Sequence, residues 1–454
     1  MTPPTAGARP GRNRLRREAV AARAAYVLRS NDVGTMTTAA PLLYPHMWSW
    51  DAAFIAVGLA SVAVERAMLE LDTLLSAQWA NGMVPHIVFS PESDSYFPGP
   101  ERWECSRLAA AAPEVPETSG ICQPPVHALA LQRILEASEA QGGDVGQAAF
   151  LARTWPRLVS WHRWLATARD PTAVGRVTIH HGWESGMDNS PRWDGPYARI
   201  EVGADLPPYA RKDTAFVLDP GERPTDEEYD RYLWLVEEMR RARYDDAQVR
   251  AGASFAVEDV FFSAVLAVAC EALADVGAHS GMPAAEVDEQ RALAERFRRG
   301  VWQSVHPDTG LARDRDVRTG EWLSTDTIAG FAPLLCGGDP AAERRLLDVF
   351  ESPEWCGHPD FQVALPPSTA PGSPHFRARQ YWRGPQWPVI AWLFSWAFHR
   401  HGWAAHGDRL AAEGLELLAR GEFGEYYEPF TGEPLGSSHQ SWTAAVALDW
   451  LNHS

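Results

Sequence analysis

Helical periodicity is the feature that most limits the fold of this chain. Apolar residues recur at spacings of three and four along most of the sequence, whereas strand-like stretches are confined to residues 84–89 and 176–180. We expect helices at about residues 13–30, 49–62, 64–80, 124–140, 146–168, 228–244, 256–278, 284–302, 325–336, 340–351, 385–401, 404–420 and 438–452.

The connections between these helices indicate their arrangement. Short and long connections alternate, which predicts helical hairpins closed into a ring, an all-α (α/α)6 barrel. An open α-solenoid has the same local pattern, but it would carry a repeat of about 34 to 47 residues, and the sequence has no such period. We expect a single domain over residues 13–454, preceded by a disordered segment at 1–12.

Three long connections, 81–123, 169–227 and 352–384, are rich in proline. In a toroid such loops gather at one end of the helices and form a pocket there, because loops carry most binding residues. Residues 201–230 are acidic and proline-rich, yet they also contain tyrosine and arginine. We predict that they form a mobile lid loop, with a disordered linker as the alternative.

Charge and cysteine usage exclude several classes of function. A formal net charge of −18 disfavours nucleic acid or an anionic membrane as a partner. Five cysteines without CxxC spacing indicate free thiols in a reducing cytosol and give no zinc signature. Residues 1–17 lack the apolar stretch of a secretory signal, and the apolar stretches at 261–270 and 389–398 are too short to span a bilayer. We expect a cytoplasmic protein whose oligomeric state stays open, a homo-oligomer being one alternative.

Two carboxylate-bearing motifs lie among aromatic residues, glycine and proline, 237 positions apart (425 minus 188). The first is WESGMDNSPRWD at 183–194, and the second is EYYEPFTG at 425–432. Aromatic rings stack on the C–H faces of sugars, and a pair of carboxyl groups cleaves a glycosidic bond. The motifs therefore predict a glycosidase, provided that the fold brings them together.

Cleavage of a glycoside requires one protonated carboxylic acid and one carboxylate that acts as a base or a nucleophile. Asp188 lies between tryptophans, whose apolar surroundings would raise its pKa, although a turn or helix-capping aspartate is the alternative. Glu184 and Asp194 compete with it in the same motif. Glu425 and Glu428 offer the same ambiguity in the second motif.

Other residues suit sugar binding rather than metal binding. Asp51 follows the sequence MWSW and could bind sugar hydroxyls, the alternative being a helix N-terminal residue that interacts with the dipole. Residues 380–388, QYWRGPQWP, predict an aromatic platform before an apolar helix. His86, His127 and His439 lack HxxxH or HxH spacing, so we expect structural or hydrogen-bonding roles, and neither a metal nor a cofactor.

Together these motifs resemble those of glycoside hydrolase family 63, which includes processing α-glucosidase I and bacterial mannosylglycerate and glucosylglycerate hydrolases. The matching segments run in order through nearly the whole chain: WSWD (48–51), NGMVPH (81–86), SGMDNS (185–190), YWRGP (381–385) and EYYEPFTG (425–432).

The resemblance implies an (α/α)6 barrel and an inverting mechanism without a catalytic metal. It implies Asp188 as the general acid and Glu425, not Glu428, as the general base, with the carboxyl groups roughly 6.5–9.5 Å apart. Arg223 and Tyr229 match lid residues that close over the substrate. The complete set of predicted substrate-binding residues is Tyr44, Trp48, Trp50, Asp51, His86, Tyr96, Trp183, Gly186, Arg223, Tyr229, Tyr381, Trp382, Arg383, Gly384, Trp387 and Gln440.

The resemblance also implies a substrate. A chain of this length without an extra β-domain is similar to the bacterial enzymes that act on small anionic glycosides. This implies hydrolysis of glucosylglycerate, with mannosylglycerate or a simple α-glucoside as alternatives, and Arg223 or Arg383 as a clamp for the glycerate carboxylate. A sugar epimerase or lyase with His86 or His439 as its base, and a non-catalytic sugar-binding protein, are the competing hypotheses.

Overall fold

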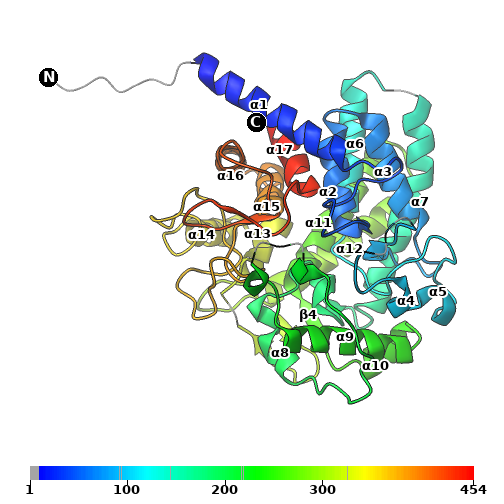
Figure 1. Cartoon of the computed structure of the whole chain (residues 1–454). Helices are drawn as coiled ribbons and strands as arrows, with labels where there is room; N and C mark the ends of the chain where they lie inside the picture. Colours follow the sequence, from blue (N-terminus) through cyan, green and yellow to red (C-terminus); the bar gives the residue numbers. More distant parts are fainter. Residues whose placement is uncertain are drawn as a thin grey trace.

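The computed structural model describes residues 10–453 except Glu92, Asp94, Asp144, Phe216, Leu218 and Thr325, so most of the segment expected to be disordered, 1–12, lies outside it. The protein is mostly helical (Figure 1). Its α-helices are α1 Pro10–Ser30, α2 Ser49–Ala60, α3 Val64–Ser76, α4 Pro100–Trp103, α5 Cys105–Leu108, α6 His127–Ala140, α7 Val145–Ala168, α8 Asp194–Ala198, α9 Asp226–Arg241, α10 Asp246–Gly252, α11 Val260–His279, α12 Ala284–Gln303, α13 Ala332–Cys336, α14 Pro340–Phe350, α15 Pro388–Arg400, α16 Ala404–Leu418 and α17 Ser441–His453.

The strands are short and form three antiparallel sheets within the described part of the chain. The largest sheet has four strands in sequence order, and the other two are pairs. The pairs are β1 Met47–Trp48 with β2 Ile87–Val88 and β7 Tyr426–Tyr427 with β8 Pro434–Leu435; the larger sheet contains β3 Val177–Ile179, β4 Val257–Asp259, β5 Asp314–Asp316 and β6 Trp322–Leu323. The chain is thus mostly helical, as expected, with small sheets added, and both predicted strand-like stretches contain strands.

Six helices contact one another in a closed circuit. α2 contacts α6, α6 contacts α11, α11 contacts α13, α13 contacts α15, and α17 contacts both α15 and α2. Every residue of α2 is buried, and so are 16 of the 20 residues of α11. Helices that are apolar on all sides can be stable only where other elements surround them, so these sequences place them inside the molecule.

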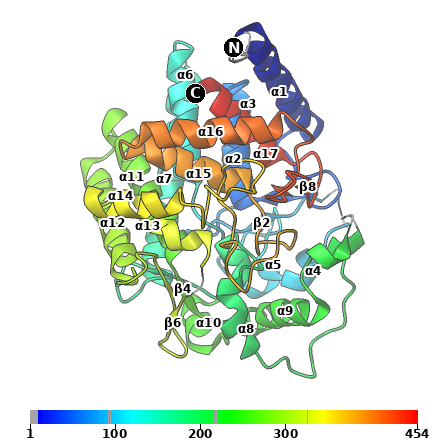
Figure 2. The same ribbon diagram turned by 90° about the vertical axis from the view of Figure 1, so that its left-hand side faces the viewer.

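A second set of helices packs on the outside of this circuit. α3 contacts α2, α7 contacts α6, α12 contacts α11, α14 contacts α13, α16 contacts α15, and α1 contacts α17. Figures 1 and 2 show that α4, α5, α8, α9 and α10 lie together at one end of these helices. The long connections that the sequence marks as pocket-forming, 81–123 and 169–227, include three of these five helices, α4, α5 and α8.

Small residues allow a close contact between α2 and α17. A Cβ atom on Gly58 would lie 2.3 Å from the Cα atom of Ala445. No real side chain fits at that distance, so a glycine on α2 and an alanine on α17 are required for these helices to pack.

The start of α11 differs from the prediction of a helix from about residue 256. Asp259 accepts hydrogen bonds from the backbone N–H groups of Phe261 and Phe262 at 2.8 and 3.1 Å, so it caps a helix that begins at Val260. Residues 257–259, directly before this helix, pair as strand β4. α11 is also longer than the apolar stretch at 261–270: its 20 residues have the length and mean hydropathy (1.8) of a membrane span, but 89% of this window is buried inside the protein.

Candidate active site

A partly enclosed cavity of about 60 Å³ lies between the segment that carries Asp188 and the segment that carries Glu425. Fourteen of the eighteen predicted site residues line it, so the fold brings the two carboxylate motifs together. The complete lining is Tyr44, Trp48, Trp50, Asp51, His86, Tyr96, Gln123, Trp183, Gly186, Asp188, Asp213, Arg223, Pro224, Tyr229, Tyr232, Tyr381, Glu425, Gln440 and Trp442.

A tight turn presents Asp188 to the cavity. It begins with the 3-10 helix η1 (Gly182–Ser185) and continues at Gly186, whose φ is +71°. A Cβ atom at this glycine would lie 2.5 Å from the ring of Trp50, so both the backbone conformation and the space require glycine. The Ser185 hydroxyl accepts a hydrogen bond from the Met187 N–H at 2.9 Å, which completes the turn.

The surroundings of Asp188 favour its protonated form. Burial raises the pKa of Asp188 to about 7, and the negative charge of Glu425 also raises it, while Arg223 acts in the opposite direction. The Tyr381 hydroxyl donates a long hydrogen bond of 3.4 Å to Oδ2. A carboxyl group with this pKa is partly protonated at neutral pH and can give its proton to a substrate.

Glu425 is held by more hydrogen-bond donors than Asp188. The Tyr44 hydroxyl donates to Oε1 at 2.9 Å, and the Ser437 N–H donates to Oε2 at 3.1 Å. Burial raises the pKa of Glu425 above its ordinary value, and Arg223 and these donors oppose that rise because they stabilise the carboxylate. The donors therefore favour the ionised form, which is the form that accepts a proton.

Asp51 is a third carboxyl group on the cavity wall, in the first turn of α2. Burial, first, and the charges of Glu425 and Asp188 raise its pKa well above the ordinary value. A protonated carboxyl group can both donate and accept hydrogen bonds. Asp51 therefore suits the recognition of sugar hydroxyls.

Arg223 supplies a buried positive charge beside these acids. Its Nη1 donates to the Tyr44 hydroxyl at 3.3 Å, its guanidinium lies 4.2 Å from the centre of the Tyr381 ring, and its Nε lies 3.5 Å from Oδ2 of Asp213. Arg223 and Asp213 both come from the segment 201–230. This segment therefore forms part of the cavity wall, the position expected of a lid, while Phe216 and Leu218 within it lie outside the described residues.

Aromatic rings make up most of the remaining wall. Trp48 packs edge-on against Tyr44 and Tyr96, with centroids 5.2 and 5.0 Å away. On the other side Trp183 lies 6.3 Å from His86 in a stacked orientation. Rings in fixed orientations provide flat apolar surfaces for the C–H faces of a sugar.

Four predicted substrate-binding residues do not line the cavity in the described structure: Trp382, Arg383, Gly384 and Trp387. The rings of Trp382 and Trp387 stack on each other at 3.6 Å, so their faces are occupied by protein. Arg383 forms an ion pair with Asp194 and is therefore not available as a carboxylate clamp. A side chain at position 384 would meet the carbonyl oxygen of Arg377 at 2.5 Å, which gives this glycine a packing role.

The competing carboxylates have structural partners. Glu184 is fully buried and accepts two hydrogen bonds from Arg169, at 2.7 and 2.9 Å; burial alone would raise its pKa, but this ion pair holds the pKa below the ordinary value. Glu428 accepts hydrogen bonds from the backbone and hydroxyl of Thr431 and stabilises a turn. With Asp194 paired to Arg383, Asp188 and Glu425 are the members of the two motifs whose carboxyl groups line the cavity.

The histidines considered as bases differ in position. His86 lines the cavity, but burial lowers its pKa to about 3, and its Nδ1 lies 3.2 Å from the Ser119 hydroxyl. His439 is exposed and does not line the cavity. Neither arrangement resembles a poised catalytic base.

Five lining residues were not predicted: Gln123, Asp213, Pro224, Tyr232 and Trp442. Tyr232 follows Tyr229 by three positions on α9, and this helical spacing could have revealed it. Gln123 lies in a connection between elements, where its Oε1 accepts a hydrogen bond from the Trp50 N–H at 3.2 Å, and no local pattern predicts that contact. Within the described ranges there is no group of three or more His, Cys, Asp or Glu side chains that could hold a metal ion.

Comparison with known proteins identifies the class. Residues 44–443 match the family described as the mannosylglycerate hydrolase MGH1-like glycoside hydrolase domain. The chain is 60% identical to the glucosylglycerate hydrolase of Mycolicibacterium hassiacum over 95% of this chain and 97% of that protein. It is 41% identical to the mannosylglycerate hydrolase of Thermus thermophilus over 94% and 99% of the two chains.

The solved structures agree. The crystal structure of the family 63 mannosylglycerate hydrolase from Thermus thermophilus in complex with Tris and D-glycerate matches with a TM-score of 0.85 and 39% identity, covering 95% of this chain and 99% of that one. The protein is therefore a glycoside hydrolase. It belongs to the MGH1-like glycoside hydrolases of family 63, which confirms the resemblance found in its motifs.

Proposed function

We propose that this protein hydrolyses glucosylglycerate to glucose and glycerate with inversion at the anomeric carbon. The observation that carries the proposal is that Asp188 and Glu425 both line one partly enclosed, aromatic-lined cavity. The 60% identity to a glucosylglycerate hydrolase, over nearly the full length of both chains, supports this choice of substrate.

In the proposed mechanism Asp188 is the general acid and Glu425 the general base. Asp188 gives its proton to the glycosidic oxygen as the bond to the anomeric carbon breaks. Glu425 takes a proton from a water molecule that attacks the same carbon from the opposite face, so an α-glycoside yields β-glucose. The raised pKa of Asp188 and the hydrogen-bond donors around Glu425 support these roles.

The aglycone of the proposed substrate carries a carboxylate, and Arg223 is its proposed partner. A guanidinium binds a carboxylate with two parallel hydrogen bonds, and Arg223 is buried on the cavity wall. The Thermus thermophilus relative with D-glycerate in its crystal structure supports a glycerate subsite in this family. Trp48, Trp183 and Asp51 are the proposed contacts of the sugar ring and its hydroxyls.

The architecture that we propose is an (α/α)6 barrel in a single domain over residues 13–454. The closed circuit of α2, α6, α11, α13, α15 and α17, with an outer helix on each, supports it. We also propose that residues 201–230 open and close over the cavity, because they contribute part of its wall and a substrate must enter. We also propose that the protein is intracellular, which fits a hydrolase of a small anionic glycoside.

Mannosylglycerate is the second candidate substrate. The family description and relatives from Selaginella moellendorffii and Thermus thermophilus, at 40–41% identity, favour it. Glucose and mannose differ only in the orientation of the 2-hydroxyl group. The discrimination therefore depends on one hydrogen-bonding position, at which an unpaired polar group carries a large penalty.

A proton NMR time course on the purified protein tests the proposal, with glucosylglycerate, mannosylglycerate and a simple α-glucobiose in parallel. Early β-glucose from glucosylglycerate would establish both the substrate and inversion. Early α-glucose would indicate retention and remove Glu425 from its role as a base. Faster release of sugar from mannosylglycerate than from glucosylglycerate would make mannosylglycerate the preferred substrate. A new double bond in the product would support the lyase hypothesis, and an epimerised sugar would support the epimerase hypothesis.

A further inference from the structure

Asp188 has few side-chain contacts of its own. Among the described residues its carboxyl group accepts one side-chain hydrogen bond, from Tyr381 at 3.4 Å, which is long. The location of this carboxyl group therefore depends on the backbone that carries it. An acid must be placed within a fraction of an ångström of its productive position, because small misplacements reduce rates by large factors.

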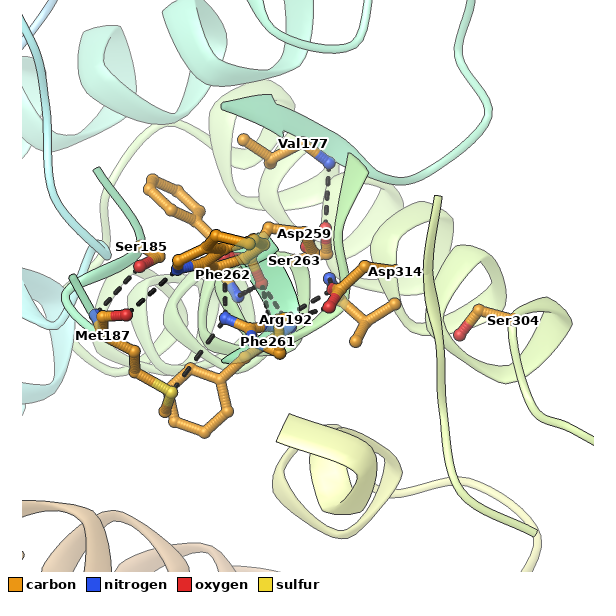
Figure 3. A network of polar contacts seen from close by, with 12 residues as sticks. Val177, Ser185, Met187, Arg192, Asp259, Phe261, Phe262, Ser263, Ser304 and Asp314 are labelled. Atoms are coloured by element: carbon orange, nitrogen blue, oxygen red, sulfur yellow. Dashed lines mark hydrogen bonds and ion pairs between the residues drawn. The ribbon is translucent and has the colours of Figure 1, made fainter. Parts of the chain in front are cut away.

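Arg192, four residues after Asp188, contacts this backbone segment and holds it in place. Its side chain is 2% exposed and lies on the face of the Trp193 ring, 4.1 Å from the ring centre. Its Nη2 also donates a weak hydrogen bond, at 4.0 Å, to Sδ of Met187, the residue directly before Asp188 (Figure 3). One guanidinium thus contacts the segments on both sides of the acid.

Two buried aspartates hold this guanidinium in turn (Figure 3). Nη1 of Arg192 donates to Asp259 at 3.1 Å and to both oxygens of Asp314 at 3.1 and 3.2 Å, and Nη2 donates to Asp259 at 3.3 Å. Asp259 caps α11, and Asp314 accepts from the backbone N–H of Val260 at 3.0 Å. The loop of the acid is therefore attached to the first turn of a core helix.

A second ion pair lies on the other side of Asp188. Glu184, four residues before it, is bound by Arg169 and also accepts from the backbone N–H groups of His180 and Cys122 at 2.7 and 3.3 Å. The catalytic turn is thus anchored at equal distances in sequence before and after the acid. Of the two anchors, Arg192 also contacts Met187, the residue directly before Asp188.

We propose that Arg192, held by Asp259 and Asp314, is a positioning residue that keeps the carboxyl group of Asp188 in its reactive place. The proposal rests on the proposed role of Asp188 as the general acid. The fork of the guanidinium is essential, because it reaches two carboxylates and Met187 at once. An ammonium group is a single point charge and cannot make this set of contacts.

Arg192→Lys tests the proposal, with Arg176→Lys as the matched control. Arg176, directly before β3, forms a buried ion pair with Glu258 of β4, 2.6 Å from its Nε, and Arg176 does not line the cavity. Each variant should lose stability, because each weakens a buried ion pair. We expect Arg192→Lys alone to lower kcat by about tenfold or more, with KM changed less than about twofold.

The pH dependence of kcat is a second measurement, because a change in folding stability alone does not shift the pH–rate profile. In Arg192→Lys a displaced Asp188 leaves the buried surroundings that raise its pKa most, and it also leaves the charges of Arg223 and Glu425. The alkaline limb of the profile should therefore move to lower pH, and the limb of Arg176→Lys should stay in place. If Arg192→Lys is too unstable to assay, Asp314→Asn keeps Arg192 and should give the same two changes to a smaller extent.

Asp188→Asn, assayed in parallel, separates failure of this inference from failure of the proposed function. If Asp188→Asn is inactive while Arg192→Lys and Asp314→Asn keep the kcat and alkaline limb of the control, the positioning role is overturned and the general acid stands. If Asp188→Asn retains the wild-type rate, the proposed function itself fails. Loss of kcat in Arg192→Lys that only follows its folded fraction would also overturn the positioning role.

Discussion

Tyr44 donates a 2.9 Å hydrogen bond to Glu425, and the two residues lie 381 positions apart in the sequence. The same hydroxyl accepts a hydrogen bond from Arg223. The positive charge of Arg223 is thus connected to the carboxylate of Glu425 through one phenol. This chain links the residue proposed to bind glycerate to the residue proposed to activate water.

Tyr44→Phe should weaken the proposed base. Without the hydroxyl, Glu425 loses a donor that lowers its pKa, so its pKa rises. A base works in its ionised form, so the acid limb of kcat should move to higher pH and the rate below neutral pH should fall several-fold. A pH–rate profile measures this, with the exposed Tyr26→Phe on α1 as the control. An unchanged acid limb would separate Tyr44 from the ionisation of Glu425.

Asp188→Asn and Glu425→Gln should each lower kcat by several orders of magnitude while the protein stays folded, since each removes one half of the proposed acid–base pair. Glu428→Gln is the matched control, because this residue lies in the same motif but binds Thr431 instead of lining the cavity. Steady-state rates and circular dichroism measure the outcome. Activity lost in Glu428→Gln and kept in Glu425→Gln would make Glu428, rather than Glu425, the general base.

Stability should depend on pH through Asp188. Its folded pKa of about 7 lies above its unfolded value near 4, so the folded state binds an extra proton between these values. The stability that this group contributes is present below about pH 4 and is lost as pH rises through 7. Asp188→Asn, which cannot ionise, should therefore raise the melting temperature at pH 8 relative to wild type and have less effect at pH 4.5. An equal shift at both pH values would show that the carboxyl group does not titrate in this range.

Arg223→Lys should weaken recognition of the anionic aglycone. The proposed bidentate contact to the glycerate carboxylate would be lost although the charge remains, so KM for glucosylglycerate should rise about tenfold or more. Inhibition by free glycerate should weaken in parallel. Arg231→Lys on α9 is a control, because its partner Glu227 is exposed on the same helix. Retention of glycerate inhibition in Arg223→Lys would move the carboxylate to another residue.

Gly186→Ala should remove activity through the backbone. The methyl group would need a positive φ and would lie 2.5 Å from the ring of Trp50, so the turn before Asp188 must shift. Gly252→Ala at the end of α10 has no atom within 4 Å of the added methyl group and should be neutral or slightly stabilising. Thermal unfolding and kcat measured on both variants test the difference.

Most helices could be predicted because their periodicity is long and regular. The short helices α4, α5, α8 and α10 have at most seven residues and were missed, since so few turns carry no clear period. β4 was absorbed into the helix prediction at 256–278 because Val257 and its neighbours continue the apolar pattern of α11. The capping aspartate at 259 was the signal that could have separated them.

The candidate site was predicted where motifs were local. Trp50, Gly186 and Asp188 were found because each lies in a short segment with unusual composition. Trp382 and Trp387 were expected on the cavity surface because the sequence shows that aromatic residues cluster but not which face of a ring is free. Arg192 lay within a quoted motif, yet its importance depends on partners 67 and 122 positions away, which no local pattern indicates.

The contact between α17 and α2 has a consequence for biosynthesis. A ribosome completes α2 and the Asp188 turn long before it reaches Glu425 and α17, which lie within the last thirty positions of the chain. Until α17 emerges, the apolar side of α2 has no neighbour there and the cavity lacks one wall. The cavity can therefore be completed only after α17 has been synthesised, although the turn that carries Asp188 is made more than 230 residues earlier.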